Sequence, residues 1–194
     1  MTAIIDYRAG NLTSVRLALS ALGEKACVTG DARLIEQADR VVFPGVGAAA
    51  SAMANINRLG LGEVVRSAAA EKPFLGICLG MQILFEHSEE DGGVDTLGIL
   101  SGQVRRFPDV PGCKVPQIGW NSVAGLSAGG DSDPEFYFVH SYYAELCPDT
   151  VGTTEYAGVR FTAMVQRGRL WACQFHPEKS GRLGLELIER WLRC

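Results

Sequence analysis

The sequence predicts an α/β fold in which a mostly parallel central sheet is flanked by helices and extended by antiparallel strands in the second half. Up to residue 87, short apolar runs alternate with segments whose apolar residues recur at helical spacing, as in a parallel sheet covered on both faces. From about 92 to 172 the strand-like runs are shorter and separated by Gly, Pro and Asp, which is typical of antiparallel strands. A length of 194 residues suits one domain, 1–194, with one sizeable core.

In the first half, each apolar run of strand length leads into a run of helical periodicity, and Gly23 marks the end of the first helix. Strands are expected at 2–7, 25–29, 40–43 and 73–78, and helices at 11–22, 32–38, 48–58, 61–71 and 79–87.

In the second half, strands are expected at 104–107, 122–126, 135–146, 153–166 and 169–175. A closing helix is expected over 180–192, because its apolar residues form one stripe: Leu183, Leu187, Ile188 and Trp191. Ser180 is expected to cap the N-terminus of this helix, since a serine hydroxyl can accept a hydrogen bond from a free backbone N–H there.

Composition excludes several classes of protein. Apolar residues make up 47 % and charged residues 21 %, so the chain can form a core and is not expected to be disordered. The net charge of −4 and the lack of a basic run argue against a nucleic-acid backbone as partner. No apolar window approaches the roughly 18 residues of a membrane span, and the N-terminus lacks the features of a signal peptide. Six cysteines without a Cys-x-x-Cys pair predict free thiols in the cytoplasm, with no metal and no cofactor.

One cysteine stands where a nucleophile is expected. Cys78 ends an apolar strand, a helix begins at once, and Gly76 and Gly80 flank it at equal distances. This is the pattern of a nucleophile elbow, in which a tight turn leaves no room for side chains at the flanking positions. The N-terminus of the following helix would favour a thiolate and supply N–H groups to an oxyanion. The alternative is a buried cysteine in an ordinary turn.

A cysteine nucleophile needs a base, and the chain has three histidines as candidates. His87 is expected on the exposed face of a helix, and His140 ends a strand. His176 is followed two residues later by Glu178, so in an extended segment both side chains emerge on one side. Pro177 stiffens this segment. The sequence therefore predicts a Cys-His-Glu triad in which Glu178 orients His176.

GICLGMQ at 76–82 and FHPEKS at 175–180 resemble the two signature motifs of the class I, triad-type glutamine amidotransferases. The resemblance covers essentially the whole chain and implies the flavodoxin-like fold of that class. It also implies that Cys78 attacks the carboxamide of glutamine and that His176 protonates the departing ammonia. A glutamyl thioester would then be hydrolysed to glutamate.

DYRAGNLTSV near the N-terminus, PGVG at 44–47, PQIGWN at 116–121 and FVHSYY at 138–143 resemble one branch of this class, the glutaminase subunits of imidazole glycerol phosphate synthase in histidine biosynthesis. The resemblance implies a heterodimer with a cyclase subunit, a (βα)₈ barrel that receives the ammonia and makes imidazole glycerol phosphate and AICAR. It further implies that the 44–47 loop needs rearrangement, triggered from the partner, before its N–H points at the oxyanion.

The resemblance also assigns positions. The expected oxyanion and substrate-binding residues are Gly45, Val46, Gly47, Leu79, Gln82, Glu90, Ser141 and Tyr142. The expected contacts with the partner are Asn11, Trp120, Tyr137 and Lys179. Without the resemblance, Glu90 and Lys179 would pass for solvated surface charges, and the two aromatic residues for core side chains. Three departures from the branch are Arg8, where glycine is usual, Gln117, where histidine is common, and Ala49, where phenylalanine is common.

Three interpretations are weighed. The first is the glutaminase subunit of imidazole glycerol phosphate synthase. The second is a glutaminase of another pathway, or a γ-glutamyl hydrolase, on the same scaffold. The third is a redox sensor without turnover, which would have no need of His176 and Glu178 at their spacing.

Overall fold

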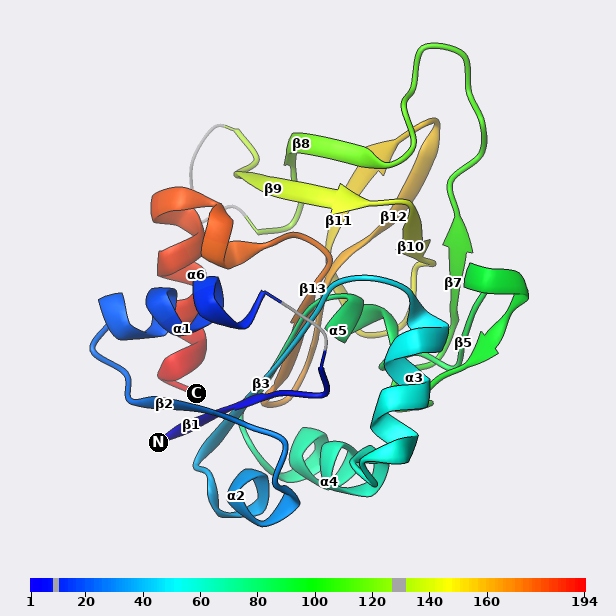
Figure 1. Cartoon of the computed structure of the whole chain (residues 1–194). Coiled ribbons are helices and arrows are strands. Elements are labelled where there is room, and N and C mark those ends of the chain that lie inside the picture. Colours follow the sequence, from blue (N-terminus) through cyan, green and yellow to red (C-terminus); the bar gives the residue numbers. More distant parts are fainter. Residues whose placement is uncertain (9–10, 127–131) are drawn as a thin grey trace.

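The computed structural model describes residues 1–8, 11–126 and 132–194 (Figure 1). Its centre is a mixed sheet that, in this described part of the chain, has eleven strands. One half is parallel, in the order β2-β1-β3-β4-β13. The sheet continues from β13 through β12, β10, β7, β5 and β6, where most pairings are antiparallel, and β11 pairs with β12. This architecture confirms the predicted fold class.

The parallel half comes almost entirely from the first 82 residues. Its elements are β1 (Thr2–Ile5), α1 (Leu12–Ala21), β2 (Ala26–Thr29), α2 (Ala32–Gln37), β3 (Arg40–Gly45), α3 (Ala49–Arg58), α4 (Gly62–Glu71), β4 (Phe74–Cys78) and α5 (Leu79–Gln82). All nine lie where the sequence places strands and helices, although α5 is much shorter than expected.

The second half supplies the antiparallel strands and the last helix. Its elements are β5 (His87–Ser88), η1 (Glu90–Gly92), β6 (Val94–Asp95), β7 (Gln103–Arg106), β8 (Gln117–Ser122), β9 (Glu135–His140), β10 (Tyr142–Ala144), β11 (Thr150–Tyr156), β12 (Val159–Arg167), β13 (Leu170–Cys173), η2 (Pro177–Lys179) and α6 (Gly181–Leu192). Strands β8 and β9 form a separate antiparallel pair.

Four expectations from the sequence are wrong. The run 153–166, expected as one strand, forms the antiparallel strands β11 and β12, which are joined by a turn at Ala157 and Gly158. The helix expected over 79–87 ends at Gln82, because the carbonyls of residues 83 to 85 accept hydrogen bonds from the backbone of 97–100 instead of continuing a helix. His87 consequently lies on β5. The strand expected at 122–126 does not form: Ser122 is the last residue of β8, and beyond it the segment contributes only a bridge between Ala124 and Thr153. The run 135–146 divides at Ser141 into β9 and β10, which belong to different sheets.

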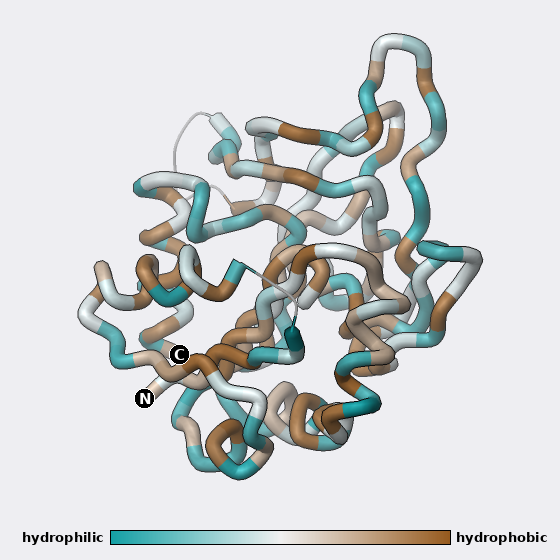
Figure 2. Tube along the Cα trace, viewed as in Figure 1, coloured by the Kyte–Doolittle hydropathy of each residue, from teal (hydrophilic) through white to brown (hydrophobic). Residues whose placement is uncertain are grey.

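Apolar side chains fill both faces of the central sheet. One core lies under α2, α3 and α4, and the other lies under α1 and α6 (Figure 1). The strands between them are strongly apolar, as the brown central traces in Figure 2 show. Burial on both faces explains why these strands read as continuous apolar runs rather than alternating ones. Within the described residues, none of the helices combines the length and apolar character that crossing a membrane requires.

Candidate active site at the ends of strands β4 and β13

The turn at Cys78 brings a strand end, a strained residue and a helix start together. Cys78 closes β4 with φ 55° and ψ −113°, a left-handed backbone conformation that is costly for any residue but glycine. An added Cβ at Gly80 would lie 1.8 Å from the carbonyl oxygen of Phe43 on β3, so no side chain fits there. This steric limit explains why residue 80, two positions after the cysteine, is a glycine. The arrangement directs the thiol to the carboxyl edge of the sheet, where α/β proteins form their sites.

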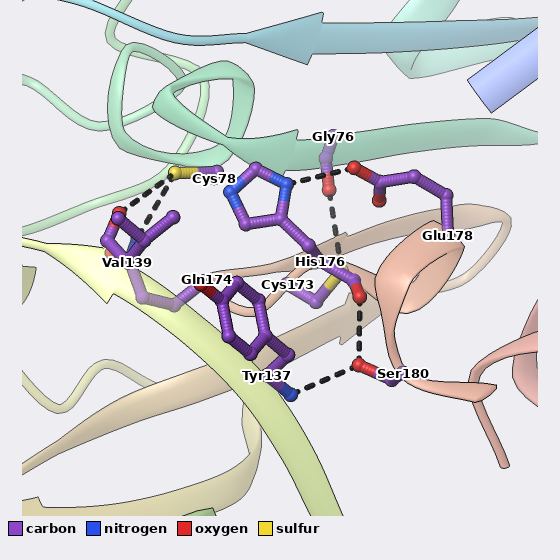
Figure 3. A network of polar contacts seen from close by, with 9 residues as sticks. All are labelled: Gly76, Cys78, Tyr137, Val139, Cys173, Gln174, His176, Glu178 and Ser180. Carbon is purple, nitrogen blue, oxygen red and sulfur yellow. Dashed lines mark hydrogen bonds and ion pairs between the residues drawn. The ribbon is translucent and has the colours of Figure 1, made fainter. Parts of the chain in front are cut away.

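His176 and Glu178 form a closely paired couple beside this turn. The segment after β13 is extended at His176 and then enters η2, which returns Glu178 toward the imidazole. His176 Nδ1 lies 2.8 Å from Glu178 Oε1, with side-chain exposures of only 2 % and 1 %. Figure 3 shows the other ring nitrogen turned toward Cys78. Among the described residues this Nε2 has no hydrogen-bond partner, which leaves it available to a substrate.

The protonation of His176 depends on its two neighbours. Burial lowers the pKa of His176, but the interactions with Cys78 and Glu178 outweigh burial and raise it to about 10. These interactions favour the imidazolium, the state that can carry a proton to a leaving group.

A cavity of about 300 Å³ opens over the sulfur of Cys78. Its lining includes His176 and seven of the eight positions that the resemblance assigns to oxyanion and substrate: Val46, Gly47, Leu79, Gln82, Glu90, Ser141 and Tyr142. The eighth, Gly45, lies just behind the cavity, in a crevice that Val46 and Glu178 also line. A larger cavity of about 710 Å³ lies beside α6, but its described lining holds no cysteine or histidine. The chemistry therefore points to the smaller cavity.

Gln82 is held by a buried polar network rather than pointing freely into the cavity. Its Nε2 donates to the carbonyl of Tyr142 at 2.8 Å and to Gln174 Oε1 at 2.9 Å. Gln174 in turn places its Nε2 3.7 Å from Cys78 Sγ. Sequence analysis missed Gln174, although a polar residue at the end of the apolar run LWAC was the available signal. The network connects the sulfur with the wall of the cavity.

Glu90 links the cavity to the start of α3. Its Oε2 accepts a 2.6 Å hydrogen bond from the backbone N–H of Ala49, the first residue of that helix. Burial raises the pKa of Glu90, although this hydrogen bond acts in the opposite direction. Half-buried and bonded in this way, Glu90 is not a freely solvated acid. Ala49 is itself completely buried, so a larger side chain there would need different packing.

His140 supports the opposite wall of the cavity. Its Nδ1 lies 2.7 Å from the carbonyl oxygen of Tyr142, and its Nε2 lies 3.0 Å from the amide of Gln117. Burial lowers the pKa of His140 to about 4, so the ring is neutral and carries one N–H. The atom of Gln117 beside Nε2 is Oε1. A neutral ring that donates its one N–H from Nδ1 to the carbonyl can only accept at Nε2, so this pairing requires the Gln117 amide to turn its NH₂ group toward the ring. Gln117 is therefore a buried structural partner, and its departure from the branch alters this support.

Of the positions expected at a partner interface, Trp120 and Lys179 are exposed and Tyr137 and Asn11 are half-buried. Trp120 is 55 % exposed and Ile118 on the same face of β8 is 64 % exposed, so Trp120 is not a core aromatic. Tyr137 on β9 packs edge-on against Trp120, with ring centroids 6.2 Å apart. Lys179 is exposed, and Asn11 is half-buried beside the crevice behind the cavity.

The structure also accounts for the unusual residue at position 8 and corrects the expected cap at Ser180. Arg8 has φ 67°, which explains why glycine is usual at this position. Ser180 does not cap α6 with its side chain. Its hydroxyl instead donates to the carbonyl of His176 and accepts from the N–H of Tyr137, and so ties β9 to the segment that bears the histidine (Figure 3).

Comparison with known families agrees with this geometry. The sequence model of the family described as glutamine amidotransferase class-I matches residues 3–193. The chain belongs to this family.

Relatives with curated names indicate one branch of this family. Imidazole glycerol phosphate synthase subunit HisH of Acinetobacter baylyi is 45 % identical over 98 % of this chain and 96 % of its own length. The HisH subunits of Methylococcus capsulatus and Moorella thermoacetica are 48 % and 49 % identical, covering 98 % and 97 % of this chain and 95 % and 92 % of theirs.

Solved structures agree at the level of the fold. A crystal structure of a glutamine amidotransferase has a TM-score of 0.75 at 19 % identity, covering 98 % of this chain and 97 % of its own. A putative GMP synthase subunit from Thermoplasma acidophilum has a TM-score of 0.71 at 16 % identity, covering 99 % and 92 %.

Proposed function

We propose that this chain is the glutaminase subunit of an imidazole glycerol phosphate synthase, an enzyme of histidine biosynthesis. It hydrolyses glutamine to glutamate and ammonia, and a cyclase subunit uses the ammonia to make imidazole glycerol phosphate and AICAR. The observation that carries the proposal is Cys78 under a cavity of about 300 Å³ with the buried His176–Glu178 pair beside it. The sequence similarity supports the same conclusion, because this chain is 45 % and 48 % identical to two HisH subunits.

In the first step the thiolate of Cys78 attacks the carboxamide carbon of glutamine. A C–S bond forms while the carbonyl electron pair moves onto oxygen. The N–H of Leu79 at the start of α5 is one donor to this oxyanion, and a second N–H comes from the oxyanion loop, residues 44–47.

In the second step the C–N bond breaks and His176 gives its proton to the nitrogen, so that ammonia leaves. The product is a γ-glutamyl thioester on Cys78. His176 is then neutral and takes a proton from water, whose oxygen attacks the thioester. The C–S bond breaks, glutamate leaves, and the thiolate and imidazolium are restored.

Glutamine is held by groups on both sides of the cavity. Glu90 offers a carboxylate to the ammonium of glutamine, and Ser141 and Tyr142 also line the cavity. Gln82 holds the Tyr142 carbonyl and so fixes that wall.

The partner docks on the exposed side formed by Trp120, Tyr137, Lys179 and Asn11, and the two chains form a heterodimer. Ammonia released into water would be protonated and lost to the reaction, so direct transfer to the cyclase barrel follows from the chemistry. A cytoplasmic location belongs to this proposal, because a nucleophilic thiol needs reducing surroundings.

The proposal is tested with Cys78→Ala in the assembled complex. Glutamine-dependent product formation should disappear, whereas formation from added ammonium salt should remain at the wild-type rate. Complex formation by gel filtration is the control for folding. Persistence of glutamine-dependent synthesis would contradict the proposal.

A further inference from the structure

Tyr7 carries a hydroxyl that the apolar core does not require. The residue follows β1, is completely buried, and its ring packs against Phe43 with centroids 5.3 Å apart. Among the described residues its hydroxyl has no hydrogen-bond partner. Burial, with Cys78 contributing, raises the pKa of Tyr7 above its ordinary value, so the group remains a protonated donor. A buried unpaired hydroxyl is destabilising, and phenylalanine would fill the same space without that cost.

The hydroxyl lies against Gly45, the last residue of β3 and part of the oxyanion loop. A Cβ added at Gly45 would lie 2.3 Å from Tyr7 Oη, 2.8 Å from the backbone nitrogen of Gly80 and 2.9 Å from Leu79 Cβ. Tyr7 thus reaches the seam between the end of β3 and the start of α5, where the two oxyanion donors originate. It is not among the residues that line the cavity over Cys78, so it approaches Gly45 from the core side.

The geometry of a peptide unit connects these two sides. In a trans peptide the N–H and C=O bonds point in opposite directions. When the Gly45–Val46 peptide turns its N–H into the cavity toward an oxyanion, the carbonyl of Gly45 turns away from the cavity. That carbonyl then needs a donor on the core side, because a buried carbonyl without one is costly. The unpaired hydroxyl of Tyr7 lies on that side.

We propose that Tyr7 is a positioning residue for the oxyanion loop: its hydroxyl donates to the Gly45 carbonyl when the Gly45–Val46 peptide presents its N–H to the oxyanion. The unpaired hydroxyl raises the free energy of the resting loop, and its new bond stabilises the active arrangement. Both effects move the equilibrium toward the active loop. The inference rests on the proposed glutaminase function.

The test compares wild type, Tyr7→Phe and Tyr156→Phe, in the free chain and in the complex with the cyclase and its nucleotide substrate. Tyr156 is the matched control, because its hydroxyl donates to the Lys114 carbonyl at 2.7 Å. In Tyr7→Phe the melting temperature of the free chain should rise by about 2–4 °C, since an unpaired buried hydroxyl is removed. The kcat for glutamine in the liganded complex should fall by about 3- to 10-fold with KM unchanged. Tyr156→Phe should not gain stability and should keep its kcat.

The rise in melting temperature and the fall in kcat together distinguish a positioning role of the Tyr7 hydroxyl from a role in packing alone. A lower melting temperature for Tyr7→Phe would show that the hydroxyl already has a partner at rest and would overturn the inference. So would an unchanged kcat in the liganded complex. Failure of the wild-type complex to hydrolyse glutamine would instead contradict the proposed function, which the wild-type assay shows by itself.

Discussion

Glu178 Oε1 lies 2.8 Å from His176 Nδ1, and both side chains are almost completely buried. The carboxylate fixes the proton of the imidazole on Nδ1 in the neutral state and leaves Nε2 for the substrate. It also stabilises the imidazolium in a place where burial alone would disfavour it.

Replacement of Glu178 by glutamine should therefore damage catalysis more than binding. The amide keeps the shape but loses the charge, so the tautomer and pKa of His176 are no longer held. We expect kcat for glutamine in the liganded complex to fall by about 10²- to 10⁴-fold. The steady-state rate of glutamate formation measures this, with ammonia-dependent synthesis as the control for an intact partner. A loss below about tenfold would contradict the assigned role of Glu178.

Acid should destabilise the chain through His140. The pKa of this buried ring is lowered to about 4 from 6.5, so the unfolded state binds more protons between these pH values. The stability that neutral His140 contributes is fully present above pH 6.5 and is lost as pH falls toward about 4. The loss should amount to roughly 3 kcal/mol.

Urea unfolding at intervals over this pH range measures that effect. His140→Leu should flatten the pH dependence, whereas the half-exposed His87→Asn controls for the removal of a histidine. An equal slope in His140→Leu would show that the ring does not cause it.

Gln174→Met should disconnect the sulfur of Cys78 from the wall of the cavity. Methionine fills the space but cannot donate to the sulfur or accept from Gln82, whose buried N–H is left unpaired. We expect a fall in kcat of about 5- to 100-fold, from the cost of a lost buried hydrogen bond. The rate of Cys78 alkylation by iodoacetamide should fall together with kcat. Gln174→Glu is the control: it keeps an acceptor for Gln82 but loses the donor to sulfur, so it separates the two contacts. Equal kcat in wild type and Gln174→Met would contradict a role for this network.

Trp120→Ala should weaken the complex and leave the free chain intact. An exposed aromatic side chain that becomes buried in an interface contributes about 2 kcal/mol, or roughly a 30-fold change in Kd. Titration calorimetry with the cyclase measures this change. Leu34→Ala is the control, because Leu34 is exposed at 40 % and its helix, α2, lies away from β8 and β9 in Figure 1. Equal affinities for the two variants would move the interface elsewhere.

The sequence predicted the parallel half of the fold well because buried strands and amphipathic helices have distinct periodicities. The position of Cys78 was equally readable, since flanking glycines report a turn without room for side chains. The polar network was not readable, because it depends on pairs that are distant in the chain: Gln174 with Gln82, His140 with Gln117, and Ser180 with Tyr137. The short α5 was missed for the same reason: its end is determined by hydrogen bonds from residues 97–100, which no local pattern reports.

The proposed function makes glutamine hydrolysis at Cys78 dependent on a liganded cyclase partner. Glutamate release should be measured for this chain alone, with the cyclase, and with the cyclase and its nucleotide ligand. Because the proposed function assigns one oxyanion donor to a loop that rearranges only with the partner, the free chain should be about 10²- to 10³-fold slower than the liganded complex. Equal rates in all three mixtures would preserve the amidase chemistry but contradict both the gated oxyanion loop and the assignment to this synthase.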